Sequence, residues 1–180
     1  MAAQQRVITL SWARIVLVVA LLVIGSQVLL ALRSARQGFS ALLAAEIAPG
    51  DSSMNPVLVL FFQPNDCGAL RGTIEILGRN LWHVDGDTVA VLGLVLSAKE
   101  EDMVTVQAAA NFTFPLHAAR RSTAMIRRLH SLGYQETPLI TALDGKGRVR
   151  SILPAQVADS ARIAVLVSLL GSEGPRPVSP

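Results

Sequence analysis

Cys67 is the only cysteine among the 180 residues and the side chain best suited to act as a nucleophile. It follows an apolar run over residues 56–62, which predicts a buried strand. After it, apolar side chains recur at the spacing of one buried helical face: Leu70, Ile74, Leu77 and Leu81. We therefore expect Cys67 in the first turn of a helix, where backbone N–H groups can lower a thiol pKa from about 8.5 to about 3.5–7.5.

The same position also fits an inert cysteine that packs as a small apolar residue at the helix start. Asp66, beside the thiol, could assist proton transfer or simply cap the helix, and its charge would raise the thiol pKa. A single cysteine can form no disulfide within the chain and supplies no cysteine-rich zinc site. Any thiol-disulfide chemistry therefore requires a thiol from another molecule.

The other candidate residues point to no metal or cofactor. The three histidines are scattered over a predicted loop, a strand end and a helix: His83, His117 and His130. The one dense basic cluster fits a solvated helix face, or a surface for anionic headgroups or an acidic partner: Arg120, Arg121, Arg127 and Arg128. A net charge of +3 is small for a nucleic-acid-binding protein, so we expect no nucleic-acid partner.

Residues 15–32 are 18 consecutive uncharged residues between Arg14 and Arg33. As a helix they would extend about 27 Å, close to the roughly 30 Å thickness of the hydrocarbon core of a bilayer. Trp12 stands where an interfacial aromatic residue is expected. We predict a short flank over 1–14 and an uncleaved transmembrane anchor over 15–32, with the remaining chain outside the cytoplasm. The alternative is a cleaved secretory signal, which needs a shorter apolar run and a small-residue cleavage site.

Beyond the anchor, residues 33–55 are expected to form a juxtamembrane helix extension and then a linker, and residues 171–180 a disordered tail. Between them, over 56–170, extended and helical patterns alternate. Strands are expected over 56–62, 88–96, 137–143 and 148–152, with a short extended stretch over 112–116, and helices after Cys67 and over 100–110, 122–132 and 155–170. This alternation predicts an α/β domain with a mixed sheet flanked by helices.

Three segments within residues 56–170 resemble the thioredoxin fold, and membrane-tethered thioredoxin-like and redoxin proteins in particular. Residues 61–70, FFQPNDCGAL, look like the strand and Cys-x-x-Cys active site of that family. Residues 136–139 resemble its Thr-Pro motif, in which the proline is cis and faces the cysteines, and residues 144–149 resemble the turn between its last two strands. The resemblance implies that Cys67 is the catalytic nucleophile and that Thr137 and Pro138 bind substrate.

The chain also departs from the family pattern. Leu70 stands where the family has its resolving cysteine, so a mixed disulfide cannot be released within the chain. The peroxidase-type pattern has a proline seven residues and a Thr or Ser three residues before its reactive cysteine. Here those positions hold Leu60 and Pro64, so a peroxiredoxin site would lack its oxyanion-binding hydroxyl.

The resemblance implies a membrane-tethered protein in the thiol-disulfide or redox-linked maturation of envelope proteins, within cell redox homeostasis, with its domain in the periplasm or an equivalent compartment. Its expected partners are the membrane, a client protein with a thiol or disulfide, and an external resolving thiol. The alternative is a redox-inactive module that keeps the fold and holds a partner near Cys67 and Pro138. Whether the protein is an enzyme depends on whether Cys67 is exposed and acidic.

Overall fold

The structure, a computed structural model, describes residues 2–47, 55–79, 82–84, 86–97 and 99–171. It contains two compact units, residues 1–36 and residues 37–180, and helix α1 (Ala2–Ile47) runs from the first into the second. Most of the predicted linker after α1, residues 48–54, lies outside the described residues. So does the predicted disordered tail apart from its first residue.

The first unit consists of the N-terminal part of α1. The helix contains one stretch, Arg14–Ile47, that is long and apolar enough to cross a membrane by length and composition. The predicted anchor over 15–32 lies within this stretch, and its large apolar side chains are exposed, as Leu22 and Leu30 illustrate. A single apolar helix near the N-terminus is consistent with a single-pass anchor, and it is equally typical of a signal sequence.

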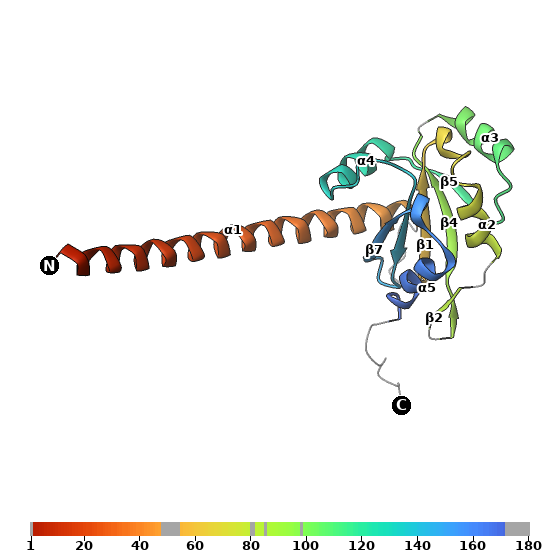
Figure 1. Cartoon of the computed structure of the whole chain (residues 1–180). Coiled ribbons are helices and arrows are strands. Elements are labelled where there is room, and N and C mark those ends of the chain that lie inside the picture. Colours follow the sequence, from red (N-terminus) through yellow and green to blue (C-terminus); the bar gives the residue numbers. More distant parts are fainter. Residues whose placement is uncertain (1, 48–54, 80–81, 85, 98, 172–180) are drawn as a thin grey trace. The chain divides into compact units, whose positions relative to one another are not determined.

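The second unit is built on a mixed sheet flanked by helices, as the sequence predicts. The sheet has five strands in the order β5-β4-β1-β6-β7 (Figure 1). Its strands are β1 (Val57–Phe62), β4 (Ala90–Val95), β5 (Leu116–Ala118), β6 (Leu139–Leu143) and β7 (Val149–Pro154). β1 pairs with β4 in parallel and β4 with β5 in parallel, whereas β6 is antiparallel to both β1 and β7. All six residues of β1 are buried, because this central strand is covered on both faces.

Alternate residues of β1 point into two separate cores. Leu58, Leu60 and Phe62 belong to a core formed with three helices: α2 (Arg71–Arg79), α3 (Glu100–Ala109) and α5 (Ser160–Ser168). Val57, Val59 and Phe61 belong to the core on the opposite face, which includes α4 (Ser122–Ser131). Figure 1 shows α2 and α4 on opposite sides of the sheet. The domain therefore has three layers, with the sheet in the middle.

The C-terminal end of α1 belongs to the second core. Phe39 and Leu43 are fully buried there, and the two rings of Phe39 and Phe61 have their centroids 5.9 Å apart. Ser40 Oγ accepts a hydrogen bond of 3.0 Å from the backbone N–H of Val149, and Glu46 accepts one from the N–H of Arg120. The sequence predicts a juxtamembrane segment over 33–55, whereas in the structure residues 37–47 pack as part of the folded unit.

Several smaller features also differ from the sequence prediction. His83 lies in a short hairpin, β2 (His83–Val84) with β3 (Asp87–Thr88), rather than in a loop. The extended stretch expected over 112–116 forms a strand only from Leu116 onward. Two short 3-10 helices also occur: η2 (Ala155–Val157) lies where the sequence predicts the start of a longer helix, and η1 (Pro64–Asp66) precedes the helix that the sequence predicts from Cys67. Such single-turn elements carry too little periodicity to be recognised from apolar spacing.

The turn between β6 and β7 is held by the buried carboxylate of Asp144. Its Oδ1 accepts hydrogen bonds of 2.9 Å from the backbone N–H groups of Lys146 and Arg148. Its Oδ2 lies 2.9 Å from Arg148 Nε and 2.8 Å from Arg150 Nε. Burial alone would raise the pKa of Asp144, but these hydrogen bonds and the Arg148 charge lower it below its ordinary value.

Replacing Asp144→Asn should destabilise the domain by about 2 kcal/mol at neutral pH, because hydrogen bonds to an ionised group each stabilise by roughly 1.5–3 kcal/mol. Since the folded-state pKa is lowered, this stabilisation is present above the ordinary aspartate pKa of about 3.9 and is lost as the pH falls further. Denaturant unfolding between pH 7 and pH 3 should therefore show the two proteins converging at acid pH. A difference in unfolding free energy that stayed the same at every pH would show that the charge of Asp144 does not stabilise the fold.

Replacing Phe39→Ala should cost about 3–5 kcal/mol of unfolding free energy, because it leaves a cavity in the second core. Leu29→Ala is the control, since Leu29 lies in the same helix with 60% of its surface exposed. The unfolding free energy of each variant is measured by near-ultraviolet circular dichroism of the full chain in a neutral detergent during a denaturant titration. Equal stability of the two variants would show that residues 37–47 are not part of the domain core.

Candidate functional site

Cys67 lies in a series of tight turns between β1 and α2. It is the C-cap of η1, with φ −53° and ψ −36°, and α2 begins only at Arg71. Between them the N–H of Ala69 bonds to the carbonyl of Asp66 at 2.9 Å, and that of Leu70 bonds to the carbonyl of Cys67 at 3.3 Å. The prediction that Cys67 occupies the first helical turn is therefore wrong, and the cysteine precedes the helix by four residues.

The Cys67 loop and the Thr-Pro loop are joined through Asp66. Its Oδ2 accepts a hydrogen bond of 2.7 Å from Thr137 Oγ1 and another of 2.8 Å from the backbone N–H of Gln63. The expected capping role of Asp66 is present, although the element it caps is η1. The peptide bond between Thr137 and Pro138 is cis, as in the motif that the segment resembles. One carboxylate thus brings the predicted nucleophile and the predicted substrate-binding residues into one site.

A second set of hydrogen bonds fixes the position of the cis-proline loop against α2. The carbonyl of Pro138 accepts a bond of 2.9 Å from the N–H of Ala155, in η2. The carbonyl of Ala155 in turn accepts a bond of 3.1 Å from the Thr73 hydroxyl on α2. The cis-proline loop is therefore held by two threonine hydroxyl groups: Thr137 donates to Asp66, and Thr73 donates to the carbonyl of Ala155.

The environment of Cys67 raises its pKa instead of lowering it. Only 8% of the residue is exposed, and this burial is the largest cause. The neighbouring Asp66 carboxylate raises the pKa further, and the backbone N–H of Cys67 opposes both effects. Pro138 is buried as well, and Leu70 is completely buried in the core beneath the loop. The expectation of a helix-activated thiolate is therefore not met in this conformation.

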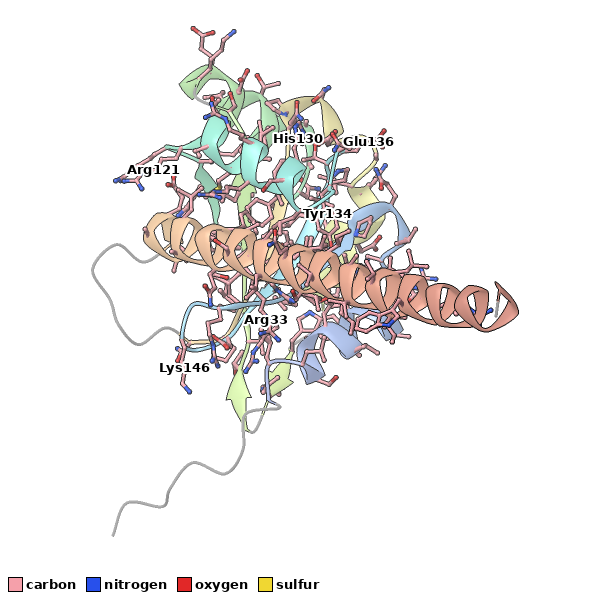
Figure 2. The ribbon with its side chains drawn as sticks, turned by 90° about the vertical axis from the view of Figure 1, so that its left-hand side faces the viewer. Arg33, Arg121, His130, Tyr134, Glu136 and Lys146 are labelled. Carbon is pink, nitrogen blue, oxygen red and sulfur yellow. The ribbon has the colours of Figure 1, made fainter. Side chains whose placement is uncertain are left out.

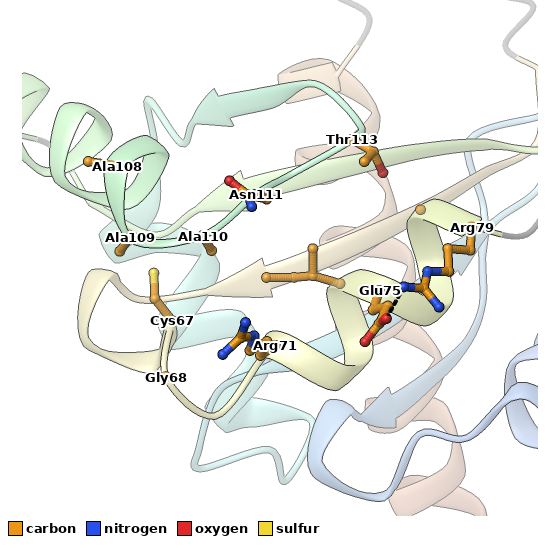
Figure 3. A pocket seen from close by; sticks show the side chains of 12 residues that line it. Cys67, Gly68, Arg71, Glu75, Arg79, Ala108, Ala109, Ala110, Asn111 and Thr113 are labelled. Carbon is orange, nitrogen blue, oxygen red and sulfur yellow. Dashed lines mark ion pairs between the residues drawn. The ribbon is translucent and has the colours of Figure 1, made fainter.

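Cys67 nevertheless lines an open pocket of about 770 Å³ between α2 and residues 108–113 (Figure 3). Figure 3 shows Cys67 at one end and Arg79 at the other, with Arg71 and Glu75 between them. Gly68, next to the cysteine, is exposed, and a side chain built there would meet nothing within 4 Å. A reagent or polypeptide can therefore approach the thiol along this pocket.

The remaining candidate residues stay apart from the site. Within the described part of the chain, no group of three or more His, Cys, Asp or Glu side chains could hold a metal ion. His83 is instead paired with Thr88 in the small hairpin, at 3.5 Å between Nδ1 and Oγ1. Figure 2 shows Arg121 and His130 at opposite ends of α4, the helix on the other face of the sheet from α2.

The sequence does not predict the pocket or the hydrogen bond between Asp66 and Thr137. The pocket lies between α2 and the C-terminal end of α3 with the residues that follow it, and small side chains such as Ala108 and Ala109 line it. Such residues carry no periodic signal that distinguishes a groove from a packed surface. The hydrogen bond could have been partly predicted, because in the family that the chain resembles the Thr-Pro motif faces the active-site loop.

Comparison with solved structures supports the fold. The chain is similar to a thiol-disulfide isomerase from Corynebacterium glutamicum, with a TM-score of 0.51 and 22% identity over 71% of this chain and 88% of that one. A protein described as a thiol:disulfide interchange protein DsbE from Chlorobium tepidum has a TM-score of 0.48, with 16% identity over 66% and 84% of the two chains. A thioredoxin-like protein from Porphyromonas gingivalis has 0.48, with 15% identity over 68% and 79%.

No protein-family model matches the chain, and no curated protein matches it in sequence. At 22% identity, the similarity to the Corynebacterium glutamicum protein shows the fold and leaves the activity open. The domain therefore has a thioredoxin-like fold, as predicted, and a single cysteine at the position where the first strand leads into the first helix of the domain.

Replacing Asp66→Asn should lower the pKa of Cys67, because it removes the negative charge beside the thiol while an amide oxygen can still accept from Thr137. The pH dependence of Cys67 alkylation should therefore move to lower pH than in the unmodified protein, with Cys67→Ser as the blank. Glu136→Gln, which removes a carboxylate one residue before Thr137, is the control. An unchanged profile in Asp66→Asn would show that Asp66 does not influence the thiol.

Proposed function

We propose that the protein is a membrane-anchored, thioredoxin-like protein that takes part in the thiol-disulfide maturation of extracytoplasmic proteins through Cys67. The observation that carries this proposal is the 2.7 Å hydrogen bond from Thr137 to Asp66, which holds the cysteine loop against the cis-proline loop. That arrangement preserves the two loops by which the resembled family binds and attacks its substrates. The exposed residues around the cysteine, Asn65, Gly68 and Ala69, would form the rest of the client-binding surface.

The proposed exchange uses one thiol of this chain. The Cys67 thiolate attacks one sulfur of a client disulfide, forming a Cys67–client disulfide while the other client sulfur leaves as a thiolate. An external thiol, supplied as a small molecule or a protein thiol, then attacks the mixed disulfide and releases the Cys67 thiolate. The net result is transfer of the client half from one disulfide to another, with no net oxidation of this chain.

The same structure explains why this exchange would be slow without further help. Burial and Asp66 raise the thiol pKa, so only a small fraction of Cys67 is the reactive thiolate at neutral pH. Leu70 provides no second sulfur to release the client. A protein of this kind is therefore suited to retaining a client as a mixed disulfide until an external thiol arrives.

Anchoring by α1 would hold this reaction at a membrane surface. The exposed apolar stretch over residues 15–32 is the proposed span, and it belongs to the same helix whose residues 37–47 pack into the folded domain. We place the domain on the extracytoplasmic side, where thiol-disulfide exchange of client proteins takes place. A cleaved signal sequence would give the same compartment without the anchor.

The burial of Cys67 and Pro138 specifically favours a second candidate function, a redox-inactive interaction module. In that case the fold and the joined loops would hold a partner protein near Cys67 without covalent chemistry. Both candidates use the same surface. They differ in whether the sulfur of Cys67 is ever joined to a client.

Because Leu70 cannot release a mixed disulfide, the unmodified chain should itself accumulate Cys67-linked adducts in cells. Non-reducing electrophoresis after rapid thiol quenching should show adducts that disappear with reductant and are absent from Cys67→Ser. Introducing the missing thiol by Leu70→Cys should reduce the adducts severalfold, since intramolecular attack can then release the client. Leu70→Ala controls for the loss of buried side-chain volume. Absence of any Cys67-dependent adduct would favour the redox-inactive module.

A further inference from the structure

The pocket beside Cys67 is a groove with a direction. At its far end α2 and residue 113 approach closely, because a Cβ atom at Gly78 would come within 1.9 Å of Thr113 Oγ1. At the near end, a Cβ atom at Gly68 would have open space around it. The groove therefore opens at the cysteine and closes about two turns along α2.

The length of the groove fits a short extended peptide. From Arg71 to Gly78 the axis of α2 advances about 10 Å, at about 1.5 Å per residue. An extended polypeptide covers that distance with about three residues, at about 3.3 Å each. The small residues Ala108 and Ala109 on the facing side leave room for its side chains.

The charged side chains along this groove are predominantly positive. Arg71, Glu75 and Arg79 lie at successive turns of α2, and Glu75 forms an ion pair with Arg79. Arg71 is the charged lining residue nearest in sequence to Cys67. Asp66 does not line the groove, and its carboxylate is bonded to Gln63 and Thr137.

From these features we infer that the groove holds the three or so residues next to the client's cysteine, and that Arg71 makes it select acidic client segments. This inference rests on the proposed function for its covalent step, and it specifies the kind of client that the site accepts. Because the groove begins at Cys67, a client held there would present its sulfur to the thiol while its neighbouring residues lie along α2. If α2 were only a solvated helix face, reversing the charge of Arg71 would change the preference for acidic clients no more than reversing an arginine elsewhere on the surface.

The test compares cysteine peptides of identical length whose neighbouring residues are aspartate, asparagine or lysine. Each peptide carries its cysteine as a mixed disulfide with thionitrobenzoate. Attack by the Cys67 thiolate on the peptide sulfur gives a Cys67–peptide disulfide and releases the coloured thionitrobenzoate anion. The full chain is assayed in an uncharged detergent, and Cys67→Ser provides the background rate.

The unmodified protein should react about three- to tenfold faster with the acidic than with the basic peptide, as expected for a few solvent-screened charge pairs. This ratio should shrink as salt is added. In Arg71→Glu it should fall to one or below, whereas Arg127→Glu, on the opposite face of the sheet, should leave it unchanged. Using the ratio removes any effect of a variant on the intrinsic reactivity of the thiol. Equal rates for the acidic and basic peptides would overturn the inference.

A binding measurement keeps the inference testable if Cys67 proves unreactive. Fluorescence anisotropy of the same peptides, labelled and with serine in place of cysteine, reports occupancy of the groove without chemistry. Arg71-dependent binding of the acidic peptide without any reaction would support the groove and contradict the monothiol function. Reaction of the acidic and basic peptides at equal rates would support the monothiol function and contradict the groove. If the peptides neither bound nor reacted, the result would contradict both the groove and the monothiol function.

Discussion

The carboxylate of Asp66 is the group on which the site depends. It accepts hydrogen bonds from Gln63, in its own loop, and from Thr137, which lies 71 positions later in the chain. The same negative charge raises the pKa of the adjacent Cys67. One residue therefore assembles the two loops of the site and weakens the acidity of its thiol, so geometry and nucleophilicity cannot both be maximal here.

This constraint operates through β1, which is buried on both faces. Leu58, Leu60 and Phe62 are fixed in one core, and the alternate residues in the other, so the chain leaves the sheet at one defined point. Cys67 follows five residues later. The second core is completed by Phe39 and Leu43 from α1, so the helix proposed to cross the membrane also supports the strand that positions the cysteine.

The fold was largely predictable from the sequence because its strands and helices have strong apolar periodicity. The strand over 56–62, the helix over 122–132 and the turn at residues 144–149 each correspond to an observed element. The local structure around Cys67 was not predictable in the same way. Apolar spacing locates the buried face of α2, but it does not show whether the helix begins at residue 67 or 71, and the thiol pKa depends on that difference.

Leu70 stabilises the fold beneath the Cys67 loop. It is completely buried, and burying a leucine side chain stabilises a fold by about 1.5–3 kcal/mol relative to leaving it exposed. The loop therefore combines a packed apolar floor with a thiol of low acidity. Under the proposed function, such a site would be better suited to holding a client than to rapid turnover, and acidic client residues along α2 would add to the retention.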